Sequence, residues 1–140
     1  MKPFEFAHGV LPGSLELAYL GDTLYDLYVR AQLVREGGRV RNMHKSAVKR
    51  VCAHAQSEAL KRIEAELTDA EADVVRRARN AHQSPPKHAD PAEYHRATAR
   101  EALIGYLYVT GQTERMDRLL CMALEIEQSG DLNEVKSDEE

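Results

Sequence analysis

Tryptophan is absent from this 140-residue chain, and cysteine occurs only at positions 52 and 121. The two cysteines form no Cys-x-x-Cys pair, so we expect two buried free thiols rather than a disulfide or a zinc site. Proline and glycine are scarce outside an N-terminal arm, a break at 36–39 and a loop at 84–91. No apolar run approaches the roughly 18 residues that cross a membrane. The first residues also lack the pattern of a signal peptide, so we expect a cytoplasmic protein.

Charge is distributed unevenly along a chain whose net charge is −4 at pH 7. Residues 41–100 contain twelve basic and eight acidic side chains, whereas residues 101–140 contain three and ten. The acidic average therefore conceals a basic centre that could face a polyanion.

The length fits one domain with one hydrophobic core. We divide the chain into an N-terminal arm (1–13), a helical domain (14–128) and an acidic tail expected to be flexible (129–140).

Apolar residues recur at helical rather than alternating spacing, which predicts an all-α fold. The helices are expected at 14–35, 42–66, 69–81, 92–110 and 112–128. Ser14 is a candidate cap for the first of them. Thr68 and Glu71 have the spacing of a capping box at the third. Asp90 is a suitable cap for the fourth, with Pro91 in its first turn.

The stretch LELAYLGDTLYDLYVRAQLV places the carboxylate of Asp22 inside a long apolar run. At 100° per residue, the helix carries mostly apolar side chains around this acid, so we expect Asp22 to be at least half buried. Glu101 has the same character in YHRATAREALIGYLYV. Gly21 and Gly105 stand near the two acids and favour a close crossing of the two helices. Such a crossing would bring the carboxylates together.

Two carboxylates that meet inside a protein require compensation of their charge. Mg²⁺ is one solution, because it binds one or two carboxylates and completes its coordination with water and substrate phosphate. The residue pattern leaves a second interpretation open. In that interpretation Asp22 accepts hydrogen bonds from tyrosine hydroxyls or pairs with a buried arginine.

These segments carry a resemblance to a known family. LAYLGDTLYDLYVR resembles the signature helix of the ribonuclease III family, and REALIGYLY resembles its second catalytic helix. The resemblance covers residues 14–125 and includes the stretches MHKSAVKRVCAHAQSEAL and LTDAEADVVRRARNA. As a whole, the chain is similar to the short Mini-III branch of the family, which consists of the catalytic domain alone. The resemblance implies an all-α, two-fold symmetric homodimer that hydrolyses double-stranded RNA with Mg²⁺, leaving a 5′-phosphate and a 3′-hydroxyl.

The Mini-III resemblance also implies a substrate and a set of site residues. The substrate is the precursor of 23S ribosomal RNA, trimmed near both ends, and the need for a ribosomal protein on the precursor stays open. Asp22 and Glu101 occupy the positions of the catalytic metal ligands. Ala18 and Thr98 stand where longer enzymes of the family have two further acids. The site therefore has fewer anionic ligands than those enzymes, and RNA phosphates are expected to complete it.

Asp26, one turn after Asp22, is an outer-shell candidate for the metal, or alternatively pairs with Arg30 at i,i+4. Duplex RNA is contacted mainly through phosphates and 2′-hydroxyls, which suits basic and amide side chains. The expected RNA contacts are Arg76, Arg77, Arg79, Asn80 and Lys87, with Lys45 and Lys49 on the second helix. Leu27 and Tyr28 are candidates for the dimer surface.

Two functions from other classes remain alternatives. One is a catalytically silent helical RNA-binding or ribosome-associated protein on the same fold, against which the presence of Asp22 and Glu101 counts. The other is a DNA-binding regulator that uses VRNMHKSAVKRVCAHAQ as a recognition helix. No second helix precedes this segment across a short turn at the required distance, so the sequence disfavours the regulator.

Overall fold

The computed structural model describes residues 10–81 and 83–124. Its elements are α1 (Ser14–Glu36), α2 (Val40–Val51), α3 (Ala53–Ile63), the short 3-10 helix η2 (Glu64–Glu66), α4 (Asp69–Arg79), α5 (Pro91–Val109) and α6 (Thr113–Leu124). These described residues contain no β-strand, which confirms the all-α prediction. None of the described helices is both long and apolar enough to cross a membrane. Residues 125–128 of the last predicted helix, and the predicted tail, lie outside the described residues.

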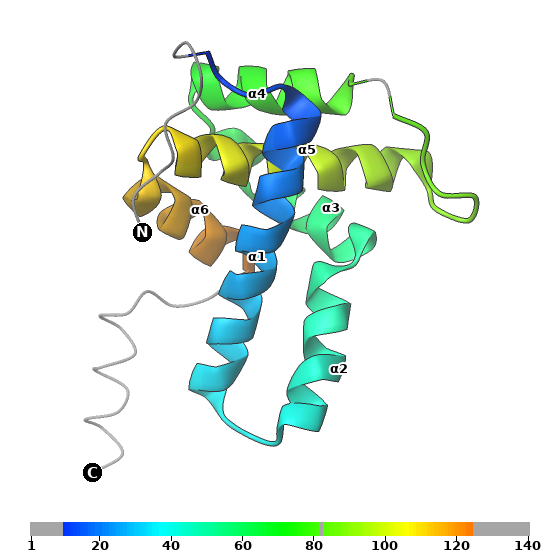
Figure 1. Ribbon diagram of the computed structural model, residues 1–140, viewed down its shortest axis with the longest axis vertical. Helices are drawn as coiled ribbons and strands as arrows, with labels where there is room; N and C mark the ends of the chain where they lie inside the picture. The colour runs from blue at the N-terminus through cyan, green and yellow to red at the C-terminus, as the bar shows by residue number, and fades with distance from the viewer. Residues whose placement is uncertain (1–9, 82, 125–140) are drawn as a thin grey trace.

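The arrangement is built around the crossing of α1 and α5, the most extensive helix contact in the described chain. Figure 1 shows α1 running across α5, with α4 along one flank of α5 and α2 extending away beside the second half of α1. The two backbones touch at glycines. A Cβ atom at Gly21 would lie 1.7 Å from the backbone oxygen of Glu101, and one at Gly105 would lie 2.1 Å from that of Leu17. The predicted close crossing is therefore confirmed.

The apolar core lies in two clusters on either side of this crossing. The larger one joins the first half of α1, through Leu17, to α3, α4, α5 and α6, and Leu60 and Leu103 are almost completely buried in it. The smaller one packs Tyr25 and Val29 of α1 against α2 and α6. Burial of a large apolar side chain stabilises the fold by about 1.5–3 kcal/mol. The clusters therefore hold both ends of α1 at a fixed angle to α5.

Side-chain caps set several helix ends. Thr68 and Glu71 form the predicted capping box, with the Thr68 N–H donating to Glu71 Oε1 at 2.9 Å and the Glu71 N–H donating to Thr68 Oγ1 at 3.2 Å. Arg115 of α6 binds both carboxylate oxygens of Glu71 and holds the pKa of that buried acid below its usual range. Asp90 caps α5 as predicted, accepting from the backbone N–H groups of its first turn.

The cap of α1 differs from the prediction. Gly13, not Ser14, is the N-cap, and Ser14 is the first helical residue. Gly13 has no side chain to accept a hydrogen bond. The Glu16 carboxylate instead accepts from the Gly13 N–H at 3.3 Å, and its negative charge also suits the first turn of a helix.

The single helix predicted over 42–66 is wrong, because the chain breaks at Cys52 into α2 and α3. Cys52 has extended backbone angles, with φ −66° and ψ 157°. A break of this kind leaves backbone carbonyls without helical partners. Here the Tyr25 hydroxyl donates to the Arg50 carbonyl at 2.9 Å and the Gln56 amide donates to the Val51 carbonyl at 2.8 Å. The free thiol of Cys52 is exposed, contrary to the expectation of two buried thiols.

Candidate active site

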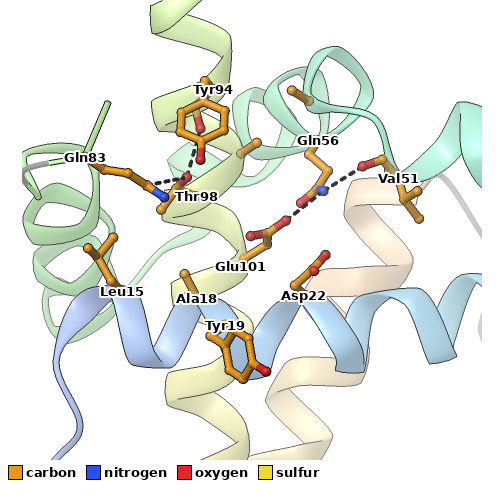
Figure 2. Close-up of a pocket in the computed structure, with 12 residues that line it drawn as sticks. Leu15, Ala18, Tyr19, Asp22, Val51, Gln56, Gln83, Tyr94, Thr98 and Glu101 are labelled. Carbon is orange, nitrogen blue, oxygen red and sulfur yellow. Dashed lines mark hydrogen bonds between the residues drawn. The ribbon is translucent and has the colours of Figure 1, made fainter. Parts of the chain in front are cut away.

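A cavity of about 320 Å³ opens where α1, the break between α2 and α3, and α5 meet. Figure 2 shows Asp22 on α1 and Glu101 on α5 turned toward the same space, with Gln56 of α3 reaching toward Glu101. Tyr94 and Thr98 of α5, together with Gln83, form another part of the wall. The glycine crossing places the two acids here, because Gly21 precedes Asp22 and its backbone lies against Glu101. The crossing thus brings the two predicted acids to one cavity.

Asp22 is exposed, whereas the sequence analysis expected it to be at least half buried. The expectation assumed that protein surrounds most of α1. On this side, however, the helix borders the open cavity, and Tyr19, one turn earlier, is 85% exposed. Apolar residue types on all sides of α1 therefore did not mean burial on all sides.

Glu101 is much less accessible, and its surroundings oppose its negative charge. The pKa of Glu101 is raised to about 7, mainly by burial and also by the nearby Asp22 carboxylate. The hydrogen bond from Gln56 Nε2 to Glu101 Oε1, at 3.0 Å, acts in the opposite direction because it stabilises the ionised form. The two acids therefore form a site where a cation would relieve unfavourable charge.

Two further residues of this region escaped the sequence analysis. Gln56 is 3% exposed and Arg100 is 1% exposed. The Arg100 guanidinium lies over the Tyr25 ring, with 3.8 Å from Cζ to the ring centroid, and its nitrogens find no hydrogen-bond acceptor among the described residues. Periodicity gave no signal for either residue, because polar side chains in a helix pattern are assigned to the solvent face.

The structure places Asp26 away from the cavity lining. Its carboxylate pairs with Arg30 Nε at 3.1 Å, so the structure contains the i,i+4 pair that was the alternative interpretation. Lys45 and Lys49 are exposed on α2. Lys49 borders a second cavity of about 460 Å³, together with Arg50. These lysines do not line the cavity of the two acids.

The basic cluster after α4 lies at the surface. Arg76, Arg77, Arg79, Asn80 and Lys87 are all exposed. Arg76 and Arg77 both pair with Asp73, at 2.5 and 2.8 Å, which neutralises part of their charge. The loop that follows begins beside the acids, because Gln83 lines their cavity. The basic end of α4 and the cavity are therefore connected by a few residues of chain.

The donor set fits a hard divalent cation. Within residues 10–81 and 83–124, no group of three or more His, Cys, Asp or Glu side chains gathers as a ready-made metal site. Asp22 and Glu101 supply carboxylate oxygens from two rigid helices, and their mutual repulsion is what a cation offsets. Mg²⁺ commonly uses one or two carboxylates and keeps several waters, which matches two acids beside an open cavity.

Comparisons with known proteins agree with this geometry. The Ribonuclease III domain family matches residues 15–112. A Mini-ribonuclease 3 of Symbiobacterium thermophilum is 48% identical over 118 residues, covering 83% of this chain and 91% of the relative. A Mini-ribonuclease 3 of Thermoanaerobacter sp. is 42% identical, covering 84% and 85%. A crystal structure of a Fusobacterium nucleatum protein superposes with a TM-score of 0.75 at 29% identity, covering 81% of this chain and 93% of that one. The chain therefore belongs to the ribonuclease III family, in its Mini-ribonuclease 3 branch, and is an endoribonuclease.

Proposed function

We propose that this endoribonuclease is a Mg²⁺-dependent homodimer that cleaves double-stranded regions of the 23S ribosomal RNA precursor in the cytoplasm. It would mature the 5′ and 3′ ends of that RNA and leave a 5′-phosphate and a 3′-hydroxyl. The observation that carries the proposal is that Asp22 and Glu101 share one cavity on a ribonuclease III domain. The substrate is proposed from the resemblance to the Mini-III branch.

Asp22 and Glu101 would hold the divalent ion, directly or through water. Such an ion supplies Lewis-acid activation of water and offsets the charge that develops on the scissile phosphate. The chain itself has to present two ionised carboxylates at a fixed separation. The backbone contact between Gly21 and Glu101 sets that separation, and the bond from Gln56 favours the ionised state of Glu101. Ala18 lines the cavity without adding charge, which leaves room for an RNA phosphate.

RNA binding is assigned to the basic end of α4 and the loop behind it. A Lys or Arg side chain attracts the phosphate backbone whatever the sequence, and this attraction weakens as salt rises. Arg79, Asn80 and Lys87 are exposed there, and Gln83 connects the same stretch to the cavity. A duplex that lies along this loop therefore passes close to Asp22 and Glu101. Lys45 and Lys49, on α2, would contact a more distant part of the same duplex.

A dimer suits the substrate, because the two strands of a duplex run in opposite directions and a two-fold axis presents one site to each. Large apolar side chains remain uncovered on α1 and α2. Leu27 is 58% exposed, Val34 65% and Val40 79%. Tyr28, the other candidate, is half buried and contacts the Cys121 sulfur at 3.0 Å within the same chain. Leu27 is therefore the better candidate for the dimer surface.

The test compares the wild type with Asp22→Asn on a duplex from the 23S precursor in Mg²⁺. We expect the wild type to cut and Asp22→Asn to lose at least about a hundredfold in rate while binding the RNA equally well in EDTA. Asp69→Asn is the matched control, because Asp69 is exposed in the first turn of α4 and does not line the cavity. Circular dichroism checks that all three proteins fold.

Two results would count against the proposal. Equal cleavage by the wild type and Asp22→Asn would show that the acid has no part in the reaction. Binding without cleavage by the wild type, at any Mg²⁺ concentration tested, would favour the silent RNA-binding protein instead.

A further inference from the structure

Gln56 lies in the wall of the cavity and is only 3% exposed. Its amide nitrogen donates to two oxygens, the Val51 carbonyl at 2.8 Å and Glu101 Oε1 at 3.0 Å. A backbone carbonyl and an ionised carboxylate can only accept hydrogen bonds. The amide orientation is therefore determined by its partners, with the nitrogen toward both acceptors.

The other end of the same amide is unsatisfied. Gln56 Oε1 is buried and finds no hydrogen-bond donor in the described part of the chain. A buried acceptor without a partner is unfavourable for stability. A cap for the Val51 carbonyl needs only one N–H. The second N–H of the same amide is directed at Glu101, so the bond to Glu101 is a separate contact that capping does not explain.

The remaining neighbours of Glu101 cannot replace this bond. Asp22 is an acid and repels the Glu101 carboxylate. Arg100 adjoins Glu101 in sequence, but its guanidinium lies over the Tyr25 ring and its nitrogens have no hydrogen-bond partner among the described residues. Figure 2 shows the Gln56 bond joining Glu101 on α5 to the chain break before α3. The break at Cys52 places Gln56 in the first turn of α3.

We propose that Gln56 is a positioning residue, which fixes the Glu101 carboxylate for the divalent ion by tying it to the break between α2 and α3. The inference rests on the proposed function and deepens it, because it states how a site with only two acids keeps one of them oriented. Outer-shell partners of metal ligands typically change metal affinity or activity by about 10- to 100-fold when they are removed.

The first experiment measures Mn²⁺ binding to the RNA-free protein by electron paramagnetic resonance. Gln56→Met keeps the size of the side chain and removes the donor. Gln112→Met is the matched control, because Gln112 is exposed and, among the described residues, its side-chain amide donates only to the nearby Thr110 hydroxyl. We expect Gln56→Met to weaken Mn²⁺ binding at least tenfold and Gln112→Met to leave it unchanged. Unchanged binding in a folded Gln56→Met protein would overturn the inference.

The same variants are then compared in cleavage. A positioning role predicts a lower kcat and a higher Mg²⁺ requirement for Gln56→Met, with the KM for RNA within about twofold of the wild-type value. A loss confined to thermal stability, with normal kcat in the folded fraction, would overturn it. A wild type that binds Mn²⁺ through Asp22 and Glu101 but cleaves no RNA would overturn the proposed function. The role of Gln56 would then still be decided by the Mn²⁺-binding comparison of Gln56→Met with the wild type.

A measurement on the wild type covers the case in which Gln56→Met does not fold. Side-chain amide signals in a ¹H–¹⁵N spectrum are followed during a Mg²⁺ titration. We expect the Gln56 amide to shift together with the backbone signal of Glu101, while the Gln112 amide stays constant. A Glu101 signal that responds to Mg²⁺ without any change at the Gln56 amide would overturn the inference.

Discussion

Glu101 has to be ionised to bind a cation, in surroundings that favour its protonated form. Burial and the neighbouring Asp22 bring its pKa to about 7, compared with an ordinary value of 4.5. A carboxyl group whose pKa is higher in the folded than in the unfolded state favours folding when it is protonated. That contribution is complete below pH 4.5 and is lost as the pH rises toward 7. The proposed metal-binding role of Glu101 thus opposes stability at this residue.

The metal-free protein should therefore lose stability as pH rises from about 4.5 to about 7. The loss attributable to Glu101 is on the order of 3 kcal/mol, since each pKa unit corresponds to about 1.4 kcal/mol. Urea denaturation in EDTA measures it, as the difference between the wild type and Glu101→Gln at each pH. Asp22→Asn should flatten the wild-type curve in part, because it removes one cause of the raised pKa. Parallel curves for the wild type and Glu101→Gln would contradict the expectation.

The sequence predicted those site residues that stand out from the residue pattern of their own helix. Asp22 and Glu101 stand out as acids in apolar helices, and the structure brings them to one cavity. The exposure of Asp22 was not predictable, because it depends on which side of α1 no other helix covers. Arg100 and Gln56 were missed for the converse reason, since their burial comes from packing partners distant in sequence.

Helices α1 and α5 depend on each other through the glycine contact. Gly105→Ala would place a methyl group 2.1 Å from the Leu17 carbonyl oxygen, which belongs to rigid backbone. We expect a loss of about 3 kcal/mol in the free energy of unfolding, at the upper end of the range for overpacking. The shift of the two helices should also reduce cleavage, because Asp22 and Glu101 would separate.

The control is Gly13→Ala, where the added Cβ would meet only the end of the flexible Glu16 side chain at 3.4 Å. It should cost no more than about 1 kcal/mol, the usual scale of an N-cap change. Thermal melting followed by circular dichroism compares the two variants. Equal melting temperatures for Gly105→Ala and the wild type would mean that the crossing can relax, contrary to our expectation.

Most helices were predictable, whereas the cap of α1 and the division of the helix expected at 42–66 were not. The capping box at Thr68 and the Asp90 cap follow from local chemistry, and both are present. The break at Cys52 has no local signal, since neither Gly nor Pro stands there. It is stabilised by hydrogen bonds from Tyr25 of α1 and Gln56 of α3 to the exposed carbonyls. A periodicity argument cannot detect partners that only the tertiary fold supplies.

At the scale of the whole molecule, the exposed side chains of α1 and α2 predict self-association. Leu27→Asp would put a charge at a side chain that is 58% exposed, so the fold should tolerate it while a dimer interface would not. Sedimentation equilibrium should give a dimer mass for the wild type and a monomer mass for Leu27→Asp. Gln112→Asp, exposed on the turn before α6, should stay dimeric. A wild type that sediments as a monomer at micromolar concentration would contradict the proposed dimer.

The contact between α1 and α5 also has a consequence for the order of folding. In the ribosome-bound chain, α1 ends at Glu36, whereas its principal partner is complete only at Val109. At about 5–20 residues per second, synthesis of the intervening chain takes roughly 4–15 s. During that time the apolar face of α1 has no α5 to cover it, and an isolated helix is marginally stable in water. The proposed catalytic centre is therefore assembled late, after most of the chain has left the peptidyl-transferase centre.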